Sequence, residues 1–371
     1  MLKRLIITVL IWKLLLIYIV LTAVYFLPFN TTFTPFKNID IMEKDLIYSV
    51  AVFANFDGIH YLDIARRGYF KLEQPFFPFY PILVRSFVAV SGSSYIIASQ
   101  LISITCLILA LYYIYKLLLI DKKQNLFTLI LLVILTFPTS YSYSASYNDS
   151  LFLLLATFTL YLGRVGRWRS ASLVSGLAVL TRLNGLALPF FLVTEYMEHK
   201  NPKKLVNISL FILIPALAFL LYLIYVQMAF GDWNLIFTTM KIWGQDKVIL
   251  PMQTFWRYFK IVFVHPNIQI TYFVALFEVI SVLAYIMLAL YTFRKIRLSY
   301  WLFMCVSFLI PAFTGTFQGM PRYALHLYPL FLGIALFLSK SSKFVRIFYF
   351  VISILLLIIS LSLFSRGYFV A

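Results

Sequence analysis

Charged residues are scarce in this chain, and acidic residues are the scarcest of them. Of 371 residues, only 13 are Asp or Glu and 12% carry a charge of either sign, whereas 63% are hydrophobic. A soluble globular protein of this length lacks the polar residues needed to cover so much apolar side-chain surface. The composition therefore excludes an ordinary soluble enzyme and predicts an integral membrane protein.

Cysteine and histidine are also rare. The two cysteines, Cys106 and Cys305, fall within apolar runs, where they are expected to act as small buried apolar side chains and indicate no disulfide. The sequence has no Asp-x-Asp element, no cluster of metal-ligating residues and no glycine-rich phosphate-binding loop. We therefore expect no metal and no other cofactor, and a soluble nucleotide sugar is disfavoured as a substrate.

The net charge of +18 comes from an excess of lysine and arginine, which is also typical of nucleic-acid-binding proteins. Here these residues gather in short loops between apolar runs rather than along one continuous face, so we expect membrane lipids and no nucleic acid as partners. Basic loops of membrane proteins stay in the cytoplasm. We predict that side for Lys3 and Arg4; Lys122 and Lys123; Arg164, Arg167 and Arg169; Lys200, Lys203 and Lys204; Arg294, Lys295 and Arg297; and Lys340, Lys343 and Arg346.

Apolar runs suited to crossing a hydrocarbon core of ~30 Å recur along the whole chain. The first run is longer than the apolar part of a secretory signal, so we expect it to be an uncleaved membrane helix. The predicted fold class is an all-α polytopic membrane protein, with a single transmembrane domain over residues 1–371. Its predicted spans are residues 5–27, 82–119 (interrupted near 91–94), 126–140, 150–162, 171–194, 205–226, 271–292, 299–313, 323–338 and 347–364.

The run at 171–194 tests this topology, because basic groups flank it on both sides. If both groups are cytoplasmic, the run must enter the membrane and return on the same side. Its middle, Thr181-Arg182-Leu183-Asn184-Gly185, has the polar residues and the glycine that a hairpin tip needs inside a protein. The alternative is one straight helix, with the opposite topology further along the chain.

Two segments are expected outside the cytoplasm, at 28–80 and 227–270. The second is rich in aromatic residues, including Trp233, Trp243 and Trp256, and is expected to contain amphipathic helices at the membrane surface. The first holds nearly half of the acidic residues, namely Asp40, Glu43, Asp45, Asp57, Asp63 and Glu73. We therefore place the predicted chemistry in the first loop.

A helix beginning near Asp57 would place His60 and Tyr61 on one face. Asp57 would then lie in the first turn, where backbone N–H groups and the helix dipole favour an ionised carboxylate. Such a carboxylate at the external membrane surface could act as a general base. It could equally do no more than cap an interfacial helix, and the local sequence leaves both interpretations open.

Four short motifs follow one another along the chain. The first runs from Phe56-Asp57-Gly58 to Gly68-Tyr69 and ends with Glu73 and Phe76-Phe77-Pro78-Phe79-Tyr80-Pro81. The others are Tyr147-Asn148-Asp149-Ser150-Leu151-Phe152, Arg182-Leu183-Asn184-Gly185, and Arg322-Tyr323 with Tyr328-Pro329. In composition and order they resemble the signature elements of the PIG-V family of mannosyltransferases, which belongs to the GT-C superfamily. The resemblance covers roughly residues 50–190 and 315–335, with Phe56 where the family usually has Trp.

This resemblance implies a GT-C-type bundle of transmembrane helices whose external loops carry amphipathic helices. It also implies an inverting glycosyltransferase that moves a sugar, most simply mannose, from a polyprenyl phosphate to an acceptor hydroxyl on a glycolipid, glycan or protein. Asp57 would be the catalytic base. The active site would face the outside of the plasma membrane, or the lumen of the endoplasmic reticulum in a eukaryote.

Displacement at an anomeric carbon also needs cations to stabilise the leaving phosphate. Arg182, Arg322 and His326 are the candidates for that role, although Arg322 could instead reach toward the membrane surface. Asp149 is equally explained as a helix cap, and Glu73 as part of a solvated loop. The candidates for binding the sugar or the acceptor are His60, Tyr61, Glu73, Asp149, Asn184 and Tyr323.

Two other functions remain open at this point. A related GT-C transferase could use another lipid-linked sugar, such as arabinose or glucose, because the motifs concern catalysis and phosphate more than sugar identity. A transporter or flippase for lipids or glycans is the alternative from another class. It would favour inverted repeats and polar residues along both sides, neither of which the sequence presents.

Overall fold

The computed structural model describes residues 1–30, 46–70, 72–198, 205–245, 247–264 and 269–370. Within these ranges the regular structure is entirely helical, apart from an isolated bridge between Ile249 and Thr314. The expected acids Asp40, Glu43 and Asp45 and the basic group Lys200, Lys203 and Lys204 lie outside the described residues.

Five helices in the described ranges are long and apolar enough to cross a membrane, and a bent helix pair is a possible sixth. The five are Leu2–Phe26, Tyr95–Ile120, Ile208–Phe230, Ile270–Thr292 and Lys343–Ser365. A helix of 23 residues is about 35 Å long, which matches the hydrocarbon core of a bilayer. The chain is therefore an all-α, multi-pass integral membrane protein.

The described residues group into two compact units. Unit 1 comprises Met1–Tyr69, Pro78–Leu154 and Ala335–Val370. Its elements are α1 (Leu2–Phe26), α3 (Tyr48–Ala51), η1 (Val52–Ala54), α4 (Asp57–Arg67), α5 (Phe79–Ser91), α6 (Tyr95–Ile120), η2 (Gln124–Leu126), α7 (Phe127–Thr136), η3 (Ser140–Ser144), the start of α8 (Asp149–Arg164), the end of α17 (Tyr328–Lys340) and α18 (Lys343–Ser365).

Unit 2 comprises Phe70–Phe77 and Leu155–Ile334. Besides the remaining parts of α8 and α17, it contains α9 (Trp168–Val179), η4 (Leu183–Ala187), α10 (Leu188–Glu198), α11 (Leu205–Phe230), α12 (Leu235–Thr238), η5 (Thr239–Trp243), α13 (Pro251–Phe259), the π-helical turn η6 (Lys260–Val264), α14 (Ile270–Thr292), α15 (Leu298–Ala312), α16 (Met320–Tyr323) and η7 (Ala324–His326).

Helices α1 and α18 of unit 1 run in the same direction. The side chain of Arg366, at the end of α18, donates a hydrogen bond to the carbonyl oxygen of Leu27, at the end of α1, at 2.9 Å. The basic groups that precede or begin these helices therefore lie at the same end of the unit, as the topology prediction requires. Helix α7 joins both, because the Trp12 indole donates to Leu135 O and the Ser353 hydroxyl to Thr136 O.

The interruption predicted near 91–94 is present. Helix α5 ends at Gly92, which adopts a left-handed conformation with φ of 65° that favours glycine. Two residues later the Ser94 hydroxyl accepts a hydrogen bond from the Ile97 amide and caps α6. The run 82–119 is therefore two helices, of which only α6 is long enough to span a membrane.

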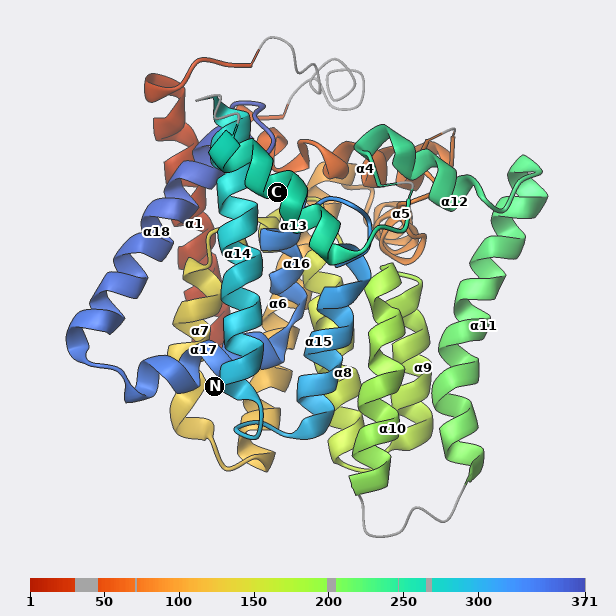
Figure 1. The fold of residues 1–371 in the computed structure, drawn as a ribbon. Coiled ribbons are helices and arrows are strands. Elements are labelled where there is room, and N and C mark those ends of the chain that lie inside the picture. Colours follow the sequence, from red (N-terminus) through yellow and green to blue (C-terminus); the bar gives the residue numbers. More distant parts are fainter. Residues whose placement is uncertain (31–45, 71, 199–204, 246, 265–268, 371) are drawn as a thin grey trace. The chain divides into compact units, whose positions relative to one another are not determined.

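The run 171–194 is a hairpin rather than a straight helix. Helices α9 and α10 lie side by side in Figure 1. The ring of Trp168, the first residue of α9, packs edge-on against that of Tyr196, near the end of α10, with centroids 5.1 Å apart. Because the start of one helix contacts the end of the other, the chain enters and returns at one end of unit 2.

An ion-pair network joins three elements at that end of unit 2. The buried carboxylate of Glu195 in α10 contacts Arg164 Nε at 3.1 Å and Arg297 Nη2 at 3.0 Å, and it accepts the Ser299 hydroxyl at 2.6 Å. Arg297 also pairs with Glu198. A buried carboxylate is stable when cations and donors surround it in this way. The network fixes the ends of α8, α10 and α15 together.

The predicted spans 150–162 and 299–313 form α8 and α15, whose 16 and 15 residues make them shorter than the five spanning helices. Two further predicted spans differ from the structure. The run 126–140 contains α7, which stops at Thr136 because Pro138 removes a backbone donor and disfavours the helical conformation before it. The run 323–338 is not one helix either. The segment Met320–His326 meets α17 at an angle of 92°, with Pro329 in the first turn of α17.

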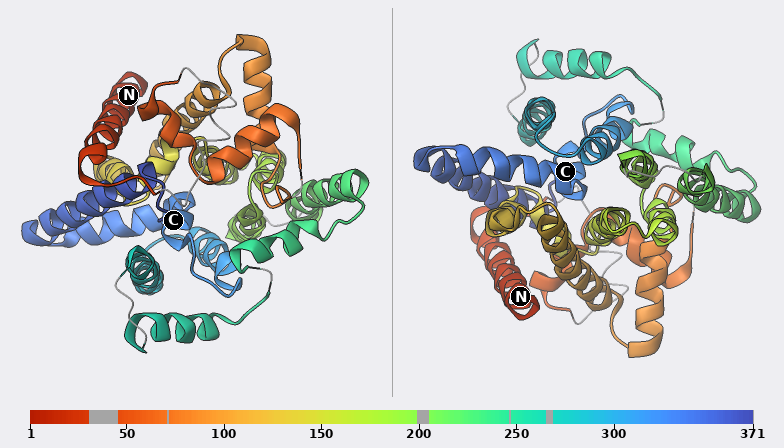
Figure 2. Two further views of the ribbon diagram at one scale, coloured as in Figure 1. Left: turned by 90° about the horizontal axis from the view of Figure 1, so that it is seen from above. Right: turned by 90° about the horizontal axis from the view of Figure 1, so that it is seen from below.

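The predicted external loop at 227–270 contains short helices, as expected. Thr254 and Tyr258 of α13 are buried, whereas Met252, Trp256 and Phe259 are exposed, so this helix is amphipathic. Figure 2 shows α13 lying across α14 rather than along it. The position of α13 at the surface of a membrane stays a prediction.

The hairpin makes a prediction about membrane labelling. In a variant with Cys106 and Cys305 replaced by alanine, single cysteines at the exposed positions Arg167 and Met197 should react with an impermeant maleimide from the same membrane face. As a reference, cysteines at Ser91 and Lys122, which flank α6, should react from opposite faces. Labelling of positions 167 and 197 from opposite faces would contradict the hairpin.

Candidate functional site

The candidate base Asp57 is the first residue of α4, as predicted, and follows a strained residue. Phe56 has φ of 57° and ψ of −118°, a conformation that costs a non-glycine residue about 1–3 kcal/mol. Its ring packs against Phe364 and Phe369, with centroids 5.5 and 5.4 Å away. This packing holds the strained turn and fixes the point at which Asp57 enters the helix.

The turn before α4 packs tightly on the segment that carries the second motif. Tyr147 donates its hydroxyl to the carbonyl oxygen of Asn55 at 2.8 Å, and the Ser146 amide donates to Phe53 O at 2.9 Å. A Cβ on Gly58 would lie only 3.3 Å from the Tyr147 ring, so glycine allows this approach. We call Asn55, Asp57, Gly58, Ser146 and Tyr147 the Asp57 cluster.

Hydrogen bonds connect the Asp57 cluster to residues of α5 and α6. Tyr80 hydrogen-bonds with Ser103 Oγ at 3.0 Å and donates to Ser99 O at 3.1 Å. Ser103 in turn donates to the carbonyl oxygen of Tyr147, at 3.1 Å. The ring of Tyr61 packs edge-on against Tyr80, with centroids 5.4 Å apart, so this predicted sugar-binding residue lies within the supporting network.

His60 and Asp63 are the other polar residues of α4. Burial lowers the pKa of His60, and the carboxylates of Asp57 and Asp63 oppose this shift. The net direction leaves the imidazole neutral at pH 7. Asp63 pairs with Arg67 one turn later at 2.7 Å. The two carboxylates of α4 thus have different surroundings, and only Asp57 begins the helix.

Asp149 begins α8 and is fully buried. It follows the Ser146–Tyr147 turn directly, so the fold brings the second motif into unit 1 beside the first. The next residue, Ser150, donates its hydroxyl to Tyr143 O at 2.6 Å. Burial of a carboxylate in the first turn of a helix suits both the capping role and the binding role that the sequence left open.

Sequence reasoning missed Lys13, a buried lysine in the middle of α1. Its Nζ donates to Gln100 Oε1 at 3.1 Å and to the Ser144 carbonyl and hydroxyl oxygens at 3.2 and 3.3 Å. It also lies 3.2 Å from the centroid of the Phe53 ring. All these partners are uncharged. A single lysine inside the otherwise apolar first span was the signal that could have revealed it.

Unit 2 brings together residues of the third and fourth motifs. Arg182 Nη1 lies 3.2 Å from His326 Nε2, although the two residues are 144 positions apart. The guanidinium also lies over the ring of Tyr323, 5.1 Å from its centroid. Since arginine can only donate, Nε2 accepts and His326 is neutral in this geometry. We call Arg182, Tyr323 and His326 the Arg182 cluster.

The hairpin tip holds Arg182 in place. Arg182 has an extended backbone, its amide donates to Ala178 O, and its side chain is only 8% exposed. Asn184 donates its amide to Ser307 O at 2.8 Å and so ties the tip to α15. A Cβ on Gly185 would lie 2.5 Å from the Val179 backbone nitrogen, which requires glycine there.

The remaining predicted residues are placed differently. Arg322 is half-buried in the short helix α16, one residue before Tyr323. Glu73 belongs to unit 2, where its carboxylate accepts the Phe70 amide at 2.8 Å. Gln74 beside it accepts the Tyr222 hydroxyl on its backbone carbonyl, so this part of the first loop packs on α11.

The fold therefore places the first two motifs in unit 1, apart from residues 70–77 of the first motif, and the last two motifs in unit 2. Among the described residues, no group of three or more His, Cys, Asp or Glu side chains could hold a metal ion. The expectation that no metal is required stays a prediction. Comparisons with protein-family models, with curated proteins and with solved structures found no match.

The close approach at Gly185 predicts a large effect of one methyl group. Gly185→Ala should destabilise the protein by about 3 kcal/mol, because the new Cβ meets backbone atoms that have no room to move. Gly176→Ala in α9 is the matched control, since its Cβ would meet the Ile214 side chain at 3.1 Å and alanine favours a helix. Thermal unfolding in detergent micelles would measure both, and equal midpoints would contradict the packing of the tip.

Proposed function

We propose that this protein is an inverting glycosyltransferase of the GT-C type that transfers a sugar, mannose in the first instance, from a polyprenyl phosphate to an acceptor hydroxyl. The observation that carries the proposal is the contact of Arg182 with His326, from motifs 144 positions apart. Arginine is the side chain whose planar, permanently charged set of donors matches the oxygens of a phosphate. A lipid phosphate is the anion that a membrane enzyme of this type would bind there.

The Asp57 cluster supports the base in this proposal. Asp57 begins α4, where the positive end of the helix dipole stabilises a negative charge. The strained Phe56 and the packed Gly58 fix the direction in which the carboxylate leaves the backbone. The base takes the proton of the acceptor hydroxyl while the hydroxyl oxygen attacks the anomeric carbon.

The Arg182 cluster acts on the other side of the reaction. As the new bond forms, the bond between the anomeric carbon and the phosphate oxygen breaks, and polyprenyl phosphate leaves with the electron pair. Arg182 stays charged and offers two N–H groups in one plane to the phosphate oxygens. His326 orients the guanidinium by accepting one of its hydrogens, and Arg322 adds a second positive charge from α16.

The remaining candidates take supporting roles in the proposal. His60 and Asp149 hold sugar or acceptor hydroxyls beside Asp57, and Tyr323 provides an aromatic face beside the phosphate. Tyr61 and Asn184 act through the scaffold, because their side chains already contact Tyr80 and Ser307. In this proposal the reaction takes place on the extracytoplasmic or lumenal side of the membrane.

Removal of the base should abolish transfer without unfolding the protein. Asp57→Asn should lower kcat for mannose transfer by about 100-fold or more, the usual contribution of a general base. The assay uses purified protein, radiolabelled polyprenyl-phosphate mannose and a membrane extract as acceptor. Asp63→Asn is the matched control on the same helix, and should keep activity because Asp63 forms a partly exposed ion pair with Arg67.

The outcomes of that assay separate the alternatives. Transfer that survives Asp57→Asn would overturn Asp57 as the base while keeping the enzyme class. Transfer from polyprenyl-phosphate arabinose or glucose, but not mannose, would correct the sugar. A wild-type protein that uses none of these donors would contradict the proposed function.

The phosphate role of Arg182 predicts a selective change in donor binding. Arg182→Gln should raise the KM for the lipid donor about tenfold or more, a loss of roughly 1.4 kcal/mol in binding, and leave the apparent KM for the acceptor unchanged. Arg169→Gln, at an exposed position of α9 outside the cluster, should change neither value. A larger effect on the acceptor than on the donor would contradict the assignment.

A further inference from the structure

A buried acid of unit 2 takes no part in the proposed chemistry. Glu278 lies in the spanning helix α14 and is 3% exposed. Its Oε2 accepts the Tyr258 hydroxyl at 2.6 Å, and its Oε1 accepts the Gly319 amide at 3.3 Å. Neither partner is a cation. Burying a carboxylate without a cation costs more free energy than burying an apolar side chain at the same position. We therefore expect a role of Glu278 beyond filling space in the core.

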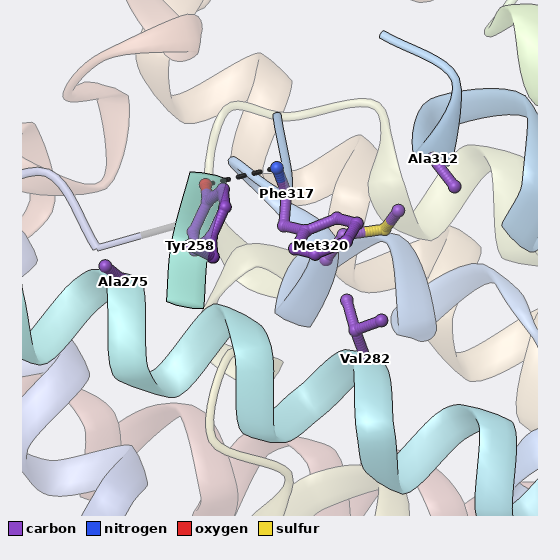
Figure 3. Packing of buried hydrophobic residues seen from close by; sticks show 6 residues of the cluster. All are labelled: Tyr258, Ala275, Val282, Ala312, Phe317 and Met320. Atoms are coloured by element: carbon purple, nitrogen blue, oxygen red, sulfur yellow. Dashed lines mark hydrogen bonds between the residues drawn. The ribbon is translucent and has the colours of Figure 1, made fainter. Parts of the chain in front are cut away.

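The two partners of Glu278 come from different elements. Tyr258 belongs to the amphipathic helix α13, and its hydroxyl also accepts the Phe317 amide at 3.1 Å and hydrogen-bonds with Thr316 Oγ1 at 3.0 Å. Figure 3 shows the Tyr258–Phe317 bond, with both rings packed above α14. One carboxylate therefore holds α13 and the segment 314–319 on α14.

The segment 314–319 contains two glycines, which favour many backbone conformations unless contacts select one. Gly315 and Gly319 have φ of 80° and 78°, which glycine adopts readily but at the largest loss of conformational entropy of any residue. Hydrogen bonds from α14 and α13 select one conformation of this glycine-containing segment. Phe317 and Met320 are fully buried beside it, so packing supports the same conformation.

Gly319 links this anchor directly to the Arg182 cluster. Its amide donates to Glu278, while its carbonyl oxygen accepts the amides of Arg322 at 2.9 Å and Tyr323 at 3.0 Å. These two hydrogen bonds form the single turn of α16. The ring of Tyr323 lies beneath Arg182, and His326 follows three residues later. A shift of Gly319 would therefore move Arg322 and Tyr323 together.

We infer that Glu278, through Tyr258 and the Gly319 amide, is a positioning residue that sets the α16 turn for binding of the donor phosphate. The inference rests on the proposed function where it names the phosphate. The anchoring of the turn does not depend on it, and the two can be tested separately.

The first measurement is hydrogen–deuterium exchange of the full-length protein in nanodiscs. Glu278→Leu removes both acceptors and Tyr258→Phe removes the donor hydroxyl, so both should speed amide exchange in 314–323 about tenfold relative to peptides of α15. Glu278→Gln should retain most protection, because its amide can accept from Gly319 and donate to Tyr258 Oη. Tyr272→Phe is the control, since that hydroxyl donates to Val262 O in η6 rather than to this segment.

The second measurement is transfer kinetics with polyprenyl-phosphate mannose. Glu278→Leu and Tyr258→Phe should each raise the donor KM about tenfold, with kcat changed less than threefold. The double variant should raise it by less than the product of the two single effects, because both substitutions remove the Tyr258–Glu278 hydrogen bond. Glu278→Gln should be close to the wild type, and Tyr272→Phe unchanged.

Unchanged exchange in 314–323, or an equal increase throughout unit 2, would overturn the anchoring role. Faster exchange of this segment with an unchanged donor KM would overturn its connection to phosphate binding. If the wild-type protein transfers no sugar from any polyprenyl phosphate, the proposed function fails, while the exchange data still decide whether Glu278 fixes the turn.

Discussion

The structure depends on one constraint, which is that hydrocarbon offers no hydrogen bonds to a buried polar group. Each such group must find its partner within the chain. Tyr147 meets this need by donating to Asn55 O, and Ser103 by donating to Tyr147 O. Two arginines and a serine surround the carboxylate of Glu195. Helix positions and turn conformations in both units follow from these pairings.

The need for a hydrogen-bond partner inside the membrane also separates buried ionisable residues with a structural role from those with a functional one. Glu195 is paired with Arg164 and Arg297. Its burial is accounted for by a structural role, which is to join the ends of helices. Lys13 and Glu278 are different, because their described hydrogen-bond partners are uncharged although both side chains are buried. Such groups cost stability that apolar residues would not, and proteins keep them where position or chemistry requires them. Glu278 fits this description through the turn that it holds.

Patterns among neighbouring residues were sufficient to predict where several helices begin, break or turn back. Serine and glycine at 91–94 mark the break between α5 and α6, because a left-handed glycine and a serine cap are formed by neighbouring residues. The hairpin followed from charge on both sides of a run with a polar, glycine-containing centre. The start of α4 at Asp57 followed from the same kind of local pattern.

Long-range pairings were beyond such reasoning. An apolar period shows that a helix is buried but says nothing of which helix it faces, so the contact of Lys13 with Gln100 had no sequence signature. The amide of Asn184 ties the hairpin tip to Ser307, a partner that the sequence did not indicate, and its binding of substrate stays a prediction. Proline also shortened α7 within a run that hydropathy alone extended to residue 140.

The most direct test of the account is the anomeric configuration of the product. Wild-type protein would be given β-linked polyprenyl-phosphate mannose carrying 13C at the anomeric carbon, and the one-bond carbon–hydrogen coupling of the glycoside would be measured by NMR. A single displacement by an acceptor hydroxyl predicts an α-linked product and one equivalent of polyprenyl phosphate. A β-linked product, or a donor that is never consumed, would contradict the account.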